Sequence, residues 1–181
     1  MADLICISAP SGTGKSTVIN ELLKTSDKFA LSISATTRAP RGKEKNGVEY
    51  FFLDRETFLS KIEAGEFLEY EEVHGQYYGT LRSTVEKFLA EGKKVLFDID
   101  VNGAKQIKEQ YGDRAMLIFL EPPSLEELKK RLINRKTENE EKIKLRLKRL
   151  PYELEQKKHF DYSVINDDLS ETVEKIRKLI S

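Results

Sequence analysis

Four short apolar segments alternate with amphipathic segments along the chain. The apolar segments cover residues 4–8, 95–99, 115–120 and 162–165, and each precedes a segment of helical periodicity, at 16–25, 101–111, 124–135 and 168–180. Buried strands that alternate with helices are typical of a mostly parallel sheet with helices on both faces. The pattern therefore predicts an α/β fold.

Residues 33–80 interrupt this alternation. Four short β-like pieces ("SISATT", "EYFFL", "FLEYEEV" and "QYYGT") surround one helix near 55–64. Antiparallel pieces inside a parallel fold indicate an inserted subdomain. A second irregular and highly charged stretch, 131–150, has an expected break at 136–138. We expect one domain, 1–181, in which an inserted subdomain (33–80) and a lid (131–147) move on a core made of 1–32, 81–130 and 148–181.

Composition narrows the class of protein. The 31 basic and 31 acidic residues cancel, which argues against general nucleic-acid binding. Cys6 is the only cysteine, so no internal disulfide can form and a reducing compartment fits. No segment approaches the roughly 20 apolar residues that span a bilayer. We therefore expect a cytoplasmic, globular protein that binds neither nucleic acid nor membrane.

The stretch "SAPSGTGKST", residues 8–17, lies between a predicted strand and a predicted helix. Its glycines allow successive backbone N–H groups to converge on phosphate oxygens, and the N-terminus of the helix adds to that field. Lys15 can reach the β and γ phosphates, and the Ser16 hydroxyl can bind Mg²⁺. The usual pattern begins with glycine where this chain has Ala9. A Gly/Ser-rich turn is the alternative, but the full spacing favours a site for a nucleoside triphosphate.

Two acidic residues follow the second predicted strand, in "VLFDID". Asp98, at the end of the apolar run, suits a Walker-B-like carboxylate that holds Mg²⁺ directly or through water. The alternative is a carboxylate that caps the next helix, and that alternative is stronger for Asp100.

The sequence does not indicate a GTPase, so the question is whether a second phosphate site accompanies the phosphate loop. A guanine-reading N-K-x-D motif is missing, and "INDD" at 165–168 is the nearest match. The stretch "TTRAPRGKEKNGVEYFF" places Arg38, Arg41 and Tyr50 together, and Tyr78 follows later. Two guanidinium groups and two phenol hydroxyls suit a monophosphate dianion. Taken singly, each is more often a surface arginine or a core tyrosine.

Five stretches, "SAPSGTGKST", "SISATTRAPRGKEKNGVEYFF", "FLEYEEVHGQYYGT", "VLFDIDVNG" and "VINDD", occur in the order and spacing of guanylate kinases. The sequence resembles that family over essentially the whole chain, and the Ala9 departure resembles its bacterial members. The resemblance implies a P-loop NTPase fold with a mixed β/α GMP-binding subdomain and a helical lid. It also implies Mg²⁺-dependent transfer of the ATP γ-phosphate to GMP, in purine nucleotide metabolism.

The resemblance also implies roles for individual residues. The residues implied in catalysis are Lys15, Arg131, Arg135 and Arg146. Those implied in ATP binding are Ala9, Pro10, Ser11, Gly12, Thr13, Gly14, Lys15, Ser16, Thr17, Arg135 and Asn166. Those implied in GMP binding are Arg38, Arg41, Tyr50 and Tyr78 for the phosphate, and Ser34, Glu69, Thr80 and Asp100 for the base. Those implied in metal binding are Ser16 and Asp98.

Hydrogen-bond chemistry supports the choice of guanine. The base presents two adjacent donors, N1–H and N2–H₂, which a carboxylate such as Glu69 can accept in parallel. Adenine presents a lone pair at N1, and a site built for hydrogen bonds can reject such a mismatch by roughly 10⁴-fold. Glu71 is the closer rival on the same strand. The phosphate of a nucleotide is already an anionic nucleophile, so neither His74 nor His159 needs to act as a general base.

Three other functions are alternatives to an ATP:GMP kinase. They are a guanylate-kinase-like module that binds phosphopeptides without catalysis, a kinase for another monophosphate, and a P-loop ATPase or GTPase regulator. The intact Lys15-Ser16 pair favours the kinase over the module. The expected partners are ATP and GMP, and the expected assembly is a monomer or a small homo-oligomer; tolerance of dGMP is left open.

Overall fold

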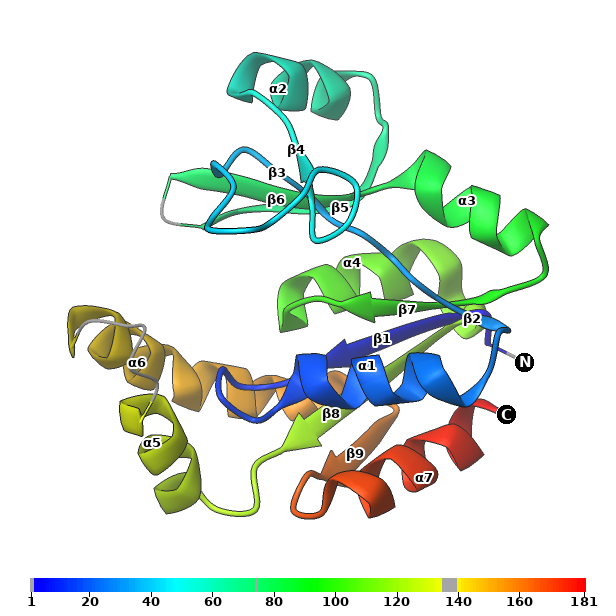
Figure 1. Ribbon diagram of the computed structural model, residues 1–181. Helices are drawn as coiled ribbons and strands as arrows, with labels where there is room; N and C mark the ends of the chain where they lie inside the picture. The colour runs from blue at the N-terminus through cyan, green and yellow to red at the C-terminus, as the bar shows by residue number, and fades with distance from the viewer. Residues whose placement is uncertain (1, 74, 135–139) are drawn as a thin grey trace.

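The computed structural model describes residues 2–73, 75–134 and 140–181. It contains two sheets with helices packed around them (Figure 1). The larger sheet has five parallel strands in the order β2-β7-β1-β8-β9. Their bounds are Phe29–Leu31 for β2, Lys94–Asp98 for β7, Leu4–Ser8 for β1, Ala115–Glu121 for β8 and Tyr162–Ile165 for β9. The four predicted strands are confirmed. The three-residue β2 was not predicted, because it is too short to give a periodic signal.

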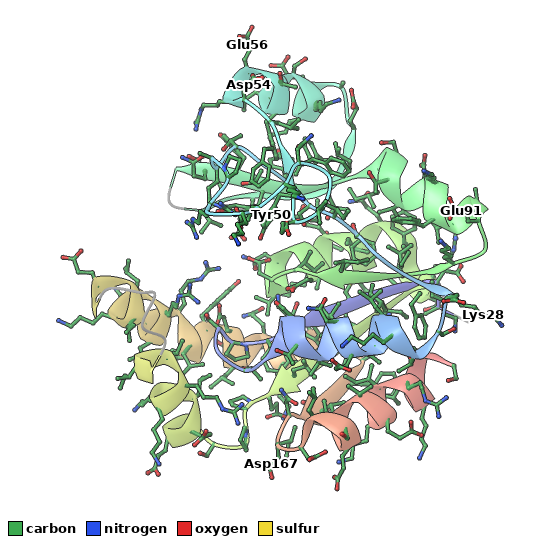
Figure 2. All side chains as sticks on the ribbon, viewed as in Figure 1. Lys28, Tyr50, Asp54, Glu56, Glu91 and Asp167 are labelled. Carbon is green, nitrogen blue, oxygen red and sulfur yellow. The ribbon has the colours of Figure 1, made fainter. Side chains whose placement is uncertain are left out.

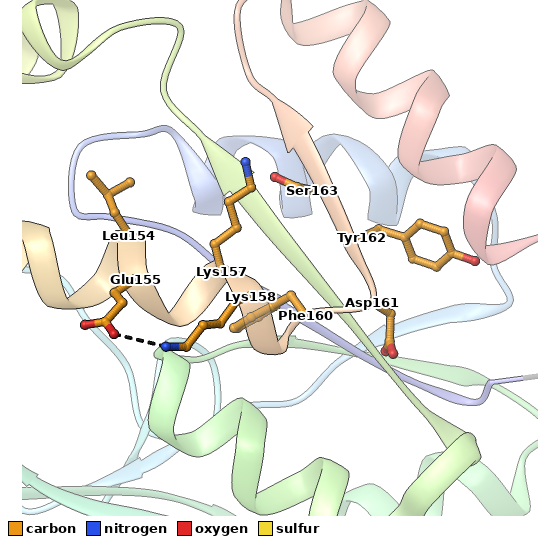
Figure 3. A pocket seen from close by; sticks show the side chains of 8 residues that line it. All are labelled: Leu154, Glu155, Lys157, Lys158, Phe160, Asp161, Tyr162 and Ser163. Carbon is orange, nitrogen blue, oxygen red and sulfur yellow. Dashed lines mark hydrogen bonds and ion pairs between the residues drawn. The ribbon is translucent and has the colours of Figure 1, made fainter.

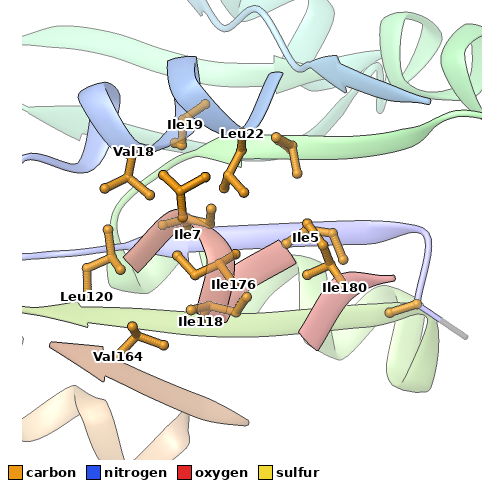
Figure 4. Close-up of a cluster of buried hydrophobic side chains, with 13 residues drawn as sticks. Ile5, Ile7, Val18, Ile19, Leu22, Ile118, Leu120, Val164, Ile176 and Ile180 are labelled. Atoms are coloured by element: carbon orange, nitrogen blue, oxygen red, sulfur yellow. The ribbon is translucent and has the colours of Figure 1, made fainter. Parts of the chain in front are cut away.

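Helices cover both faces of this sheet. They are α1 (Lys15–Thr25), α3 (Arg82–Ala90), α4 (Val101–Tyr111) and α7 (Leu169–Ile180). On one face, α1 and α7 pack on Ile5 and Ile7 of β1, in the cluster drawn in Figure 4. On the other face, α3 and α4 pack on Leu4 and Cys6. Successive side chains of a strand point to opposite faces, so the unbroken apolar run of β1 serves both cores.

The smaller, mixed sheet is built by the segment that interrupted the predicted alternation. Its strands are β3 (Ala35–Thr36), β4 (Phe51–Phe52), β5 (Phe67–Val73) and β6 (Gln76–Leu81), in the order β4-β3-β6-β5. Helix α2 (Arg55–Glu63) begins after Asp54, whose carboxylate caps the Thr57 N–H. The Phe58 ring of α2 stacks on Phe67 at a centroid distance of 4.3 Å. The small sheet therefore has a core of its own.

Two further helices, α5 (Leu125–Asn134) and α6 (Glu140–Gln156), lie beside the loop that precedes α1 (Figure 1). Leu128 and Leu132 of α5 pack against Leu150 of α6. The expected break at 136–138 lies outside the described residues. Helix α6 continues past the expected end of the lid at 147 and through Pro151. Among the described residues, no helix is both long and apolar enough to cross a membrane.

Candidate active site

The loop between β1 and α1 is shaped by two glycines. Gly12 and Gly14 have φ angles of 91° and 97°, a backbone region that favours glycine. A Cβ at Gly12 would also lie only 3.1 Å from Leu132 of α5. Gly14 stands at the N-cap of α1 and offers no capping side chain. The first N–H groups of α1 are thus available to an anion, as the motif predicts.

Asp98 joins the end of β7 to the start of α1. Lys15 Nζ lies 2.6 Å from Asp98 Oδ1 and donates to the carbonyl of Ile99 at 2.9 Å. Ser16 Oγ donates to Asp98 Oδ2 at 2.8 Å. Strands β1 and β7 are parallel neighbours, so their carboxyl ends meet at the same sheet edge. The helix-cap alternative for Asp98 is therefore wrong, because its carboxylate faces the phosphate loop.

The Ser16–Asp98 pair fits a magnesium ion. A hydroxyl and a carboxylate oxygen within hydrogen-bond distance are hard oxygen ligands of the kind Mg²⁺ prefers, and this ion usually takes few protein ligands beside water and phosphate. In the described part of the chain, no group of three or more His, Cys, Asp or Glu residues could form a complete metal site. The geometry suits a metal that arrives with a nucleotide.

Two side chains from distant elements brace the loop. Asn166, after β9, donates its Nδ2 to the Thr13 carbonyl at 2.7 Å and is 7% exposed. Arg146 of α6 donates to Ser11 Oγ. Arg146 therefore lies at the phosphate loop, as the family resemblance implies. Contact of Asn166 with adenine stays a prediction.

Arg38 and Arg41 of the small subdomain surround the carboxylate of Glu44, and we call this group the arginine site. Arg38 forms a two-pronged ion pair with Glu44, with N–O distances of 2.8 and 3.0 Å. Its guanidinium lies 5.1 Å from the centroid of the Tyr50 ring, and that ring meets Tyr78 edge-on at 6.2 Å. The backbone N–H of Arg41 donates to Glu44 at 2.7 Å. Since a carboxylate and a phosphate present similar oxygen pairs to a guanidinium, the geometry fits an anion site.

Glu69 of β5 is buried against the start of α4, and 7% of its surface is exposed. Thr80 Oγ1 donates to Glu69 Oε1 at 2.7 Å. The other oxygen approaches α4 so closely that a Cβ at Gly103 would lie 2.8 Å from it. The pKa of Glu69 is raised to about 7, and burial is the largest cause. The hydrogen bond from Thr80 acts in the opposite direction and lowers the pKa.

A second acidic pair lies next to Glu69. Asp100 caps α4 by accepting from the N–H groups of Asn102 and Gly103, so the capping alternative is confirmed for this residue. Its other oxygen, Oδ2, lies 3.7 Å from Arg149. The pKa of Glu71 is raised to about 7, first by its hydrogen bond with Asp100 and then by burial. Both acids line the same cavity, so capping does not remove Asp100 from the site.

These groups surround one cavity of about 750 Å³, the size of a small-molecule site. Predicted residues lining it are Ser11, Lys15, Ser34, Arg41, Tyr50, Glu69, Tyr78, Asp98, Asp100 and Arg146. In Figure 2, Tyr50 lies on the side of the small subdomain that faces the core. The cavity therefore joins the phosphate loop to Arg41, Tyr50 and Tyr78 of the small subdomain, while the Arg38–Glu44 pair lies outside its lining.

A separate hollow of about 470 Å³ lies where α6 ends and β9 begins (Figure 3). Its charged side chains pair with close neighbours: Lys158 with Glu155 at 3.0 Å, and Lys157 with Glu121 at 2.6 Å. It contains none of the predicted nucleotide-binding residues. The nucleotide chemistry thus belongs to the larger cavity.

Not every predicted residue reaches the cavity. Among the described residues, its lining leaves out the predicted Arg38, Thr80, Ser16 and Asn166, and the loop positions Ala9, Pro10, Gly12, Thr13, Gly14 and Thr17. Arg131 is absent from its described lining and pairs instead with Glu127, one helical turn away, at 3.1 Å. Arg135 and His74 lie outside the described residues. Glu44 and Arg149 contact predicted site residues but were not predicted from the sequence. Glu44 gave no signal among many loop charges, whereas the three-residue spacing of Arg149 from Arg146 could have placed both on one helix face.

Comparisons with known proteins identify the family. A family model described as "Guanylate kinase" matches residues 1–181. The guanylate kinase of Porphyromonas gingivalis is 55% identical over 183 residues, which cover 100% of this chain and 97% of that protein. The guanylate kinase of Clostridium tetani is 47% identical, over 98% of this chain and 85% of its own. The chain belongs to the guanylate kinase family.

The solved structures agree with this assignment. A crystal structure of guanylate kinase from Anaplasma phagocytophilum superposes with a TM-score of 0.80 at 34% identity, over 99% of this chain and 84% of that one. The expected fold is therefore confirmed, and so is the expected activity of an ATP:GMP phosphotransferase. The residue roles stay predictions.

The buried Glu69 carboxyl generates a prediction about this guanylate kinase's stability. A carboxyl whose folded pKa lies above its unfolded value destabilises the fold as pH rises from the unfolded pKa to the folded one. Glu69→Gln keeps an oxygen for Thr80 but carries no charge. We compare the free energy of unfolding of the variant with that of the parent protein. Between pH 5.5 and pH 8 this difference should shift by about 2 kcal/mol in favour of the variant, because one pKa unit corresponds to about 1.4 kcal/mol.

Urea unfolding at the two pH values measures this gain. Glu109→Gln is the matched control, because Glu109 is an exposed glutamate on α4. A difference between Glu69→Gln and the parent that does not change with pH would contradict the prediction.

Proposed function

We propose that this guanylate kinase transfers the γ-phosphate of ATP to GMP inside the 750 Å³ cavity, with ATP at the phosphate loop and GMP at the small subdomain. The observation that carries this proposal is the shared lining. Lys15 and Asp98 stand on the core side, and Tyr50 and Glu69 on the subdomain side. Two phosphate sites in one cavity support direct transfer between two nucleotides.

The GMP phosphate replaces the Glu44 carboxylate at the arginine site in this proposal. Arg38 is 9% exposed and already oriented by Glu44 and by the Tyr50 ring, so little side-chain entropy is lost on binding. Arg41 lines the cavity beside it. The phosphate needs no general base, because it is an anionic nucleophile.

The guanine base lies against Glu69. The ionised carboxylate accepts two donors from guanine, and Thr80 fixes its orientation from behind. Ser34, which also lines the cavity, donates to the guanine O6. A carboxylate with a pKa of about 7 binds the base in its ionised form, so GMP binding should draw a proton from Glu69 near neutral pH.

Catalysis comes from alignment and charge neutralisation. Lys15 neutralises the β and γ phosphate oxygens, and Arg146 approaches the same loop from α6. Ser16 and Asp98 hold Mg²⁺, which supplies positive charge to the phosphate oxygens when it is bound. The catalytic roles of Arg131 and Arg135 stay predictions from the family resemblance.

The phosphopeptide-binding module is not favoured. A module without catalysis has no need of the lysine, serine and carboxylate that meet at the end of β7. The cytoplasmic location and the assembly as a monomer or small homo-oligomer stay predictions from the sequence.

A substrate panel tests the proposed function. ADP formation from ATP is measured in parallel with GMP, dGMP, AMP, CMP, UMP and dTMP, with and without Mg²⁺. We expect kcat/KM for GMP to exceed that for AMP by roughly 10⁴-fold, because AMP presents a lone pair to Glu69. Equal turnover of AMP and GMP, or ADP formation that needs no acceptor, would contradict the proposal.

Lys15→Met should leave the protein folded but lower turnover by about 10²–10³-fold, because one preorganised charge contact to the transferring phosphate is lost. Steady-state kinetics with GMP measure the loss. Lys24→Met is the control: it removes an exposed lysine from the same helix, and parental turnover is expected. Parental turnover in a folded Lys15→Met protein would remove this lysine from the mechanism.

A further inference from the structure

One turn of α6 faces both sides of the cavity. Arg146 donates to Ser11 of the phosphate loop. Arg149, three residues later, places Nη2 3.8 Å from Glu71 Oε1 and 3.7 Å from Asp100 Oδ2. Residues three apart are neighbours on a helix surface. The resemblance to guanylate kinases assigned no role to Arg149.

The next turn of the same helix binds the same wall. Tyr152 donates its hydroxyl to Asn102 Oδ1 at 2.8 Å. Asn102 in turn donates Nδ2 to Glu71 Oε1 at 3.3 Å. One turn further on, Gln156 accepts from Lys105 of α4. The helix that carries Arg146 is thus joined by polar contacts to the first turns of α4 and to β5.

The wall that Arg149 faces is rich in carboxylates. Glu71 from β5 and Asp100 from the start of α4 are in contact, and Glu69 and Glu153 lie near Asp100. Asp100 Oδ1 is occupied by the α4 cap, which leaves Oδ2 for Arg149. Two ionised acids this close repel each other, and either a proton shared between them or a cation near both relieves the repulsion. A guanidinium can serve both acids at once.

We propose that Arg149 is a positioning residue for the acceptor nucleotide: it holds Glu71 and Asp100 in place along the guanine side of the cavity. This inference rests on the proposed function. The Arg149 side chain is 41% exposed, so its ion pairs add little to overall stability. Its effect is on the shape and charge of the wall that the GMP base contacts.

Kinetics of Arg149→Gln test the inference. We expect KM for GMP to rise about tenfold and KM for ATP to stay within twofold, because only the guanine side of the cavity changes. Arg149→Lys keeps the charge without the fork, and an intermediate rise of about threefold is expected. Lys144→Gln, an exposed lysine of the same helix, is the control and should match the parent protein.

A double-mutant cycle with Glu71→Gln separates positioning from general damage. If Arg149 acts through Glu71, Arg149→Gln should change KM for GMP by less than threefold in the Glu71→Gln background. Thermal unfolding establishes which variants are folded, and Arg149→Lys decides the matter if Arg149→Gln does not fold.

Three results would overturn the inference: an unchanged KM for GMP in the folded Arg149 variants, an equal rise in KM for both nucleotides, or fully additive effects with Glu71→Gln. Failure of the parent protein to phosphorylate GMP is a different result. It would overturn the proposed function before any Arg149 variant is compared.

Discussion

The structure around Glu69 is arranged so that its carboxylate can be buried. A carboxylate is costly to bury, and this one is 7% exposed, between the strand that carries it and the first turn of α4. Thr80 supplies one hydrogen bond, and Gly103 leaves room where any side chain would collide with the second oxygen. The fold thereby keeps an acceptor with a pKa of about 7 on the wall of the cavity. Such a group is poorly explained by stability, because an uncharged glutamine would cost less to bury.

The two proposed nucleotide sites are built in different ways. The phosphate loop depends on backbone: parallel strands bring Asp98 to the loop, and glycines let helix α1 present its N–H groups. The proposed acceptor site depends on side chains that hold one another, such as Arg38 with Glu44 and Glu71 with Asp100. Helix α6 touches both sites, through Arg146 and Arg149. Side chains of one helix therefore contact both ends of the cavity.

Local patterns in the sequence predicted the elements that have strong periodicity or strict spacing. The runs at 4–8 and 162–165 are strands, and "SGTG" is a loop that leads into the helix that "KS" begins. The family resemblance supplied the acceptor residues, of which Ser34, Tyr50, Glu69 and Tyr78 line the cavity. Two contacts were not predictable from the sequence. Glu44 lies six residues from Arg38, and their pairing depends on the path of an irregular loop. Arg149 meets the acid pair only through the tertiary packing of α6. Helix α6 also runs beyond the expected lid, because its later turns bind α4 through Tyr152 and Gln156.

In the proposed function, guanine is read by the buried Glu69 carboxylate, which loses its proton when the base binds. Isothermal titration of GMP at pH 7, in buffers of different ionisation enthalpy, counts the protons released on binding. The phosphate of GMP can also release protons, so Glu69→Gln and binding at pH 9 are the references. The account predicts that the parent protein releases more protons than Glu69→Gln at pH 7, and that the difference disappears at pH 9. Equal proton release by the two proteins at pH 7, with GMP bound equally well, would contradict it.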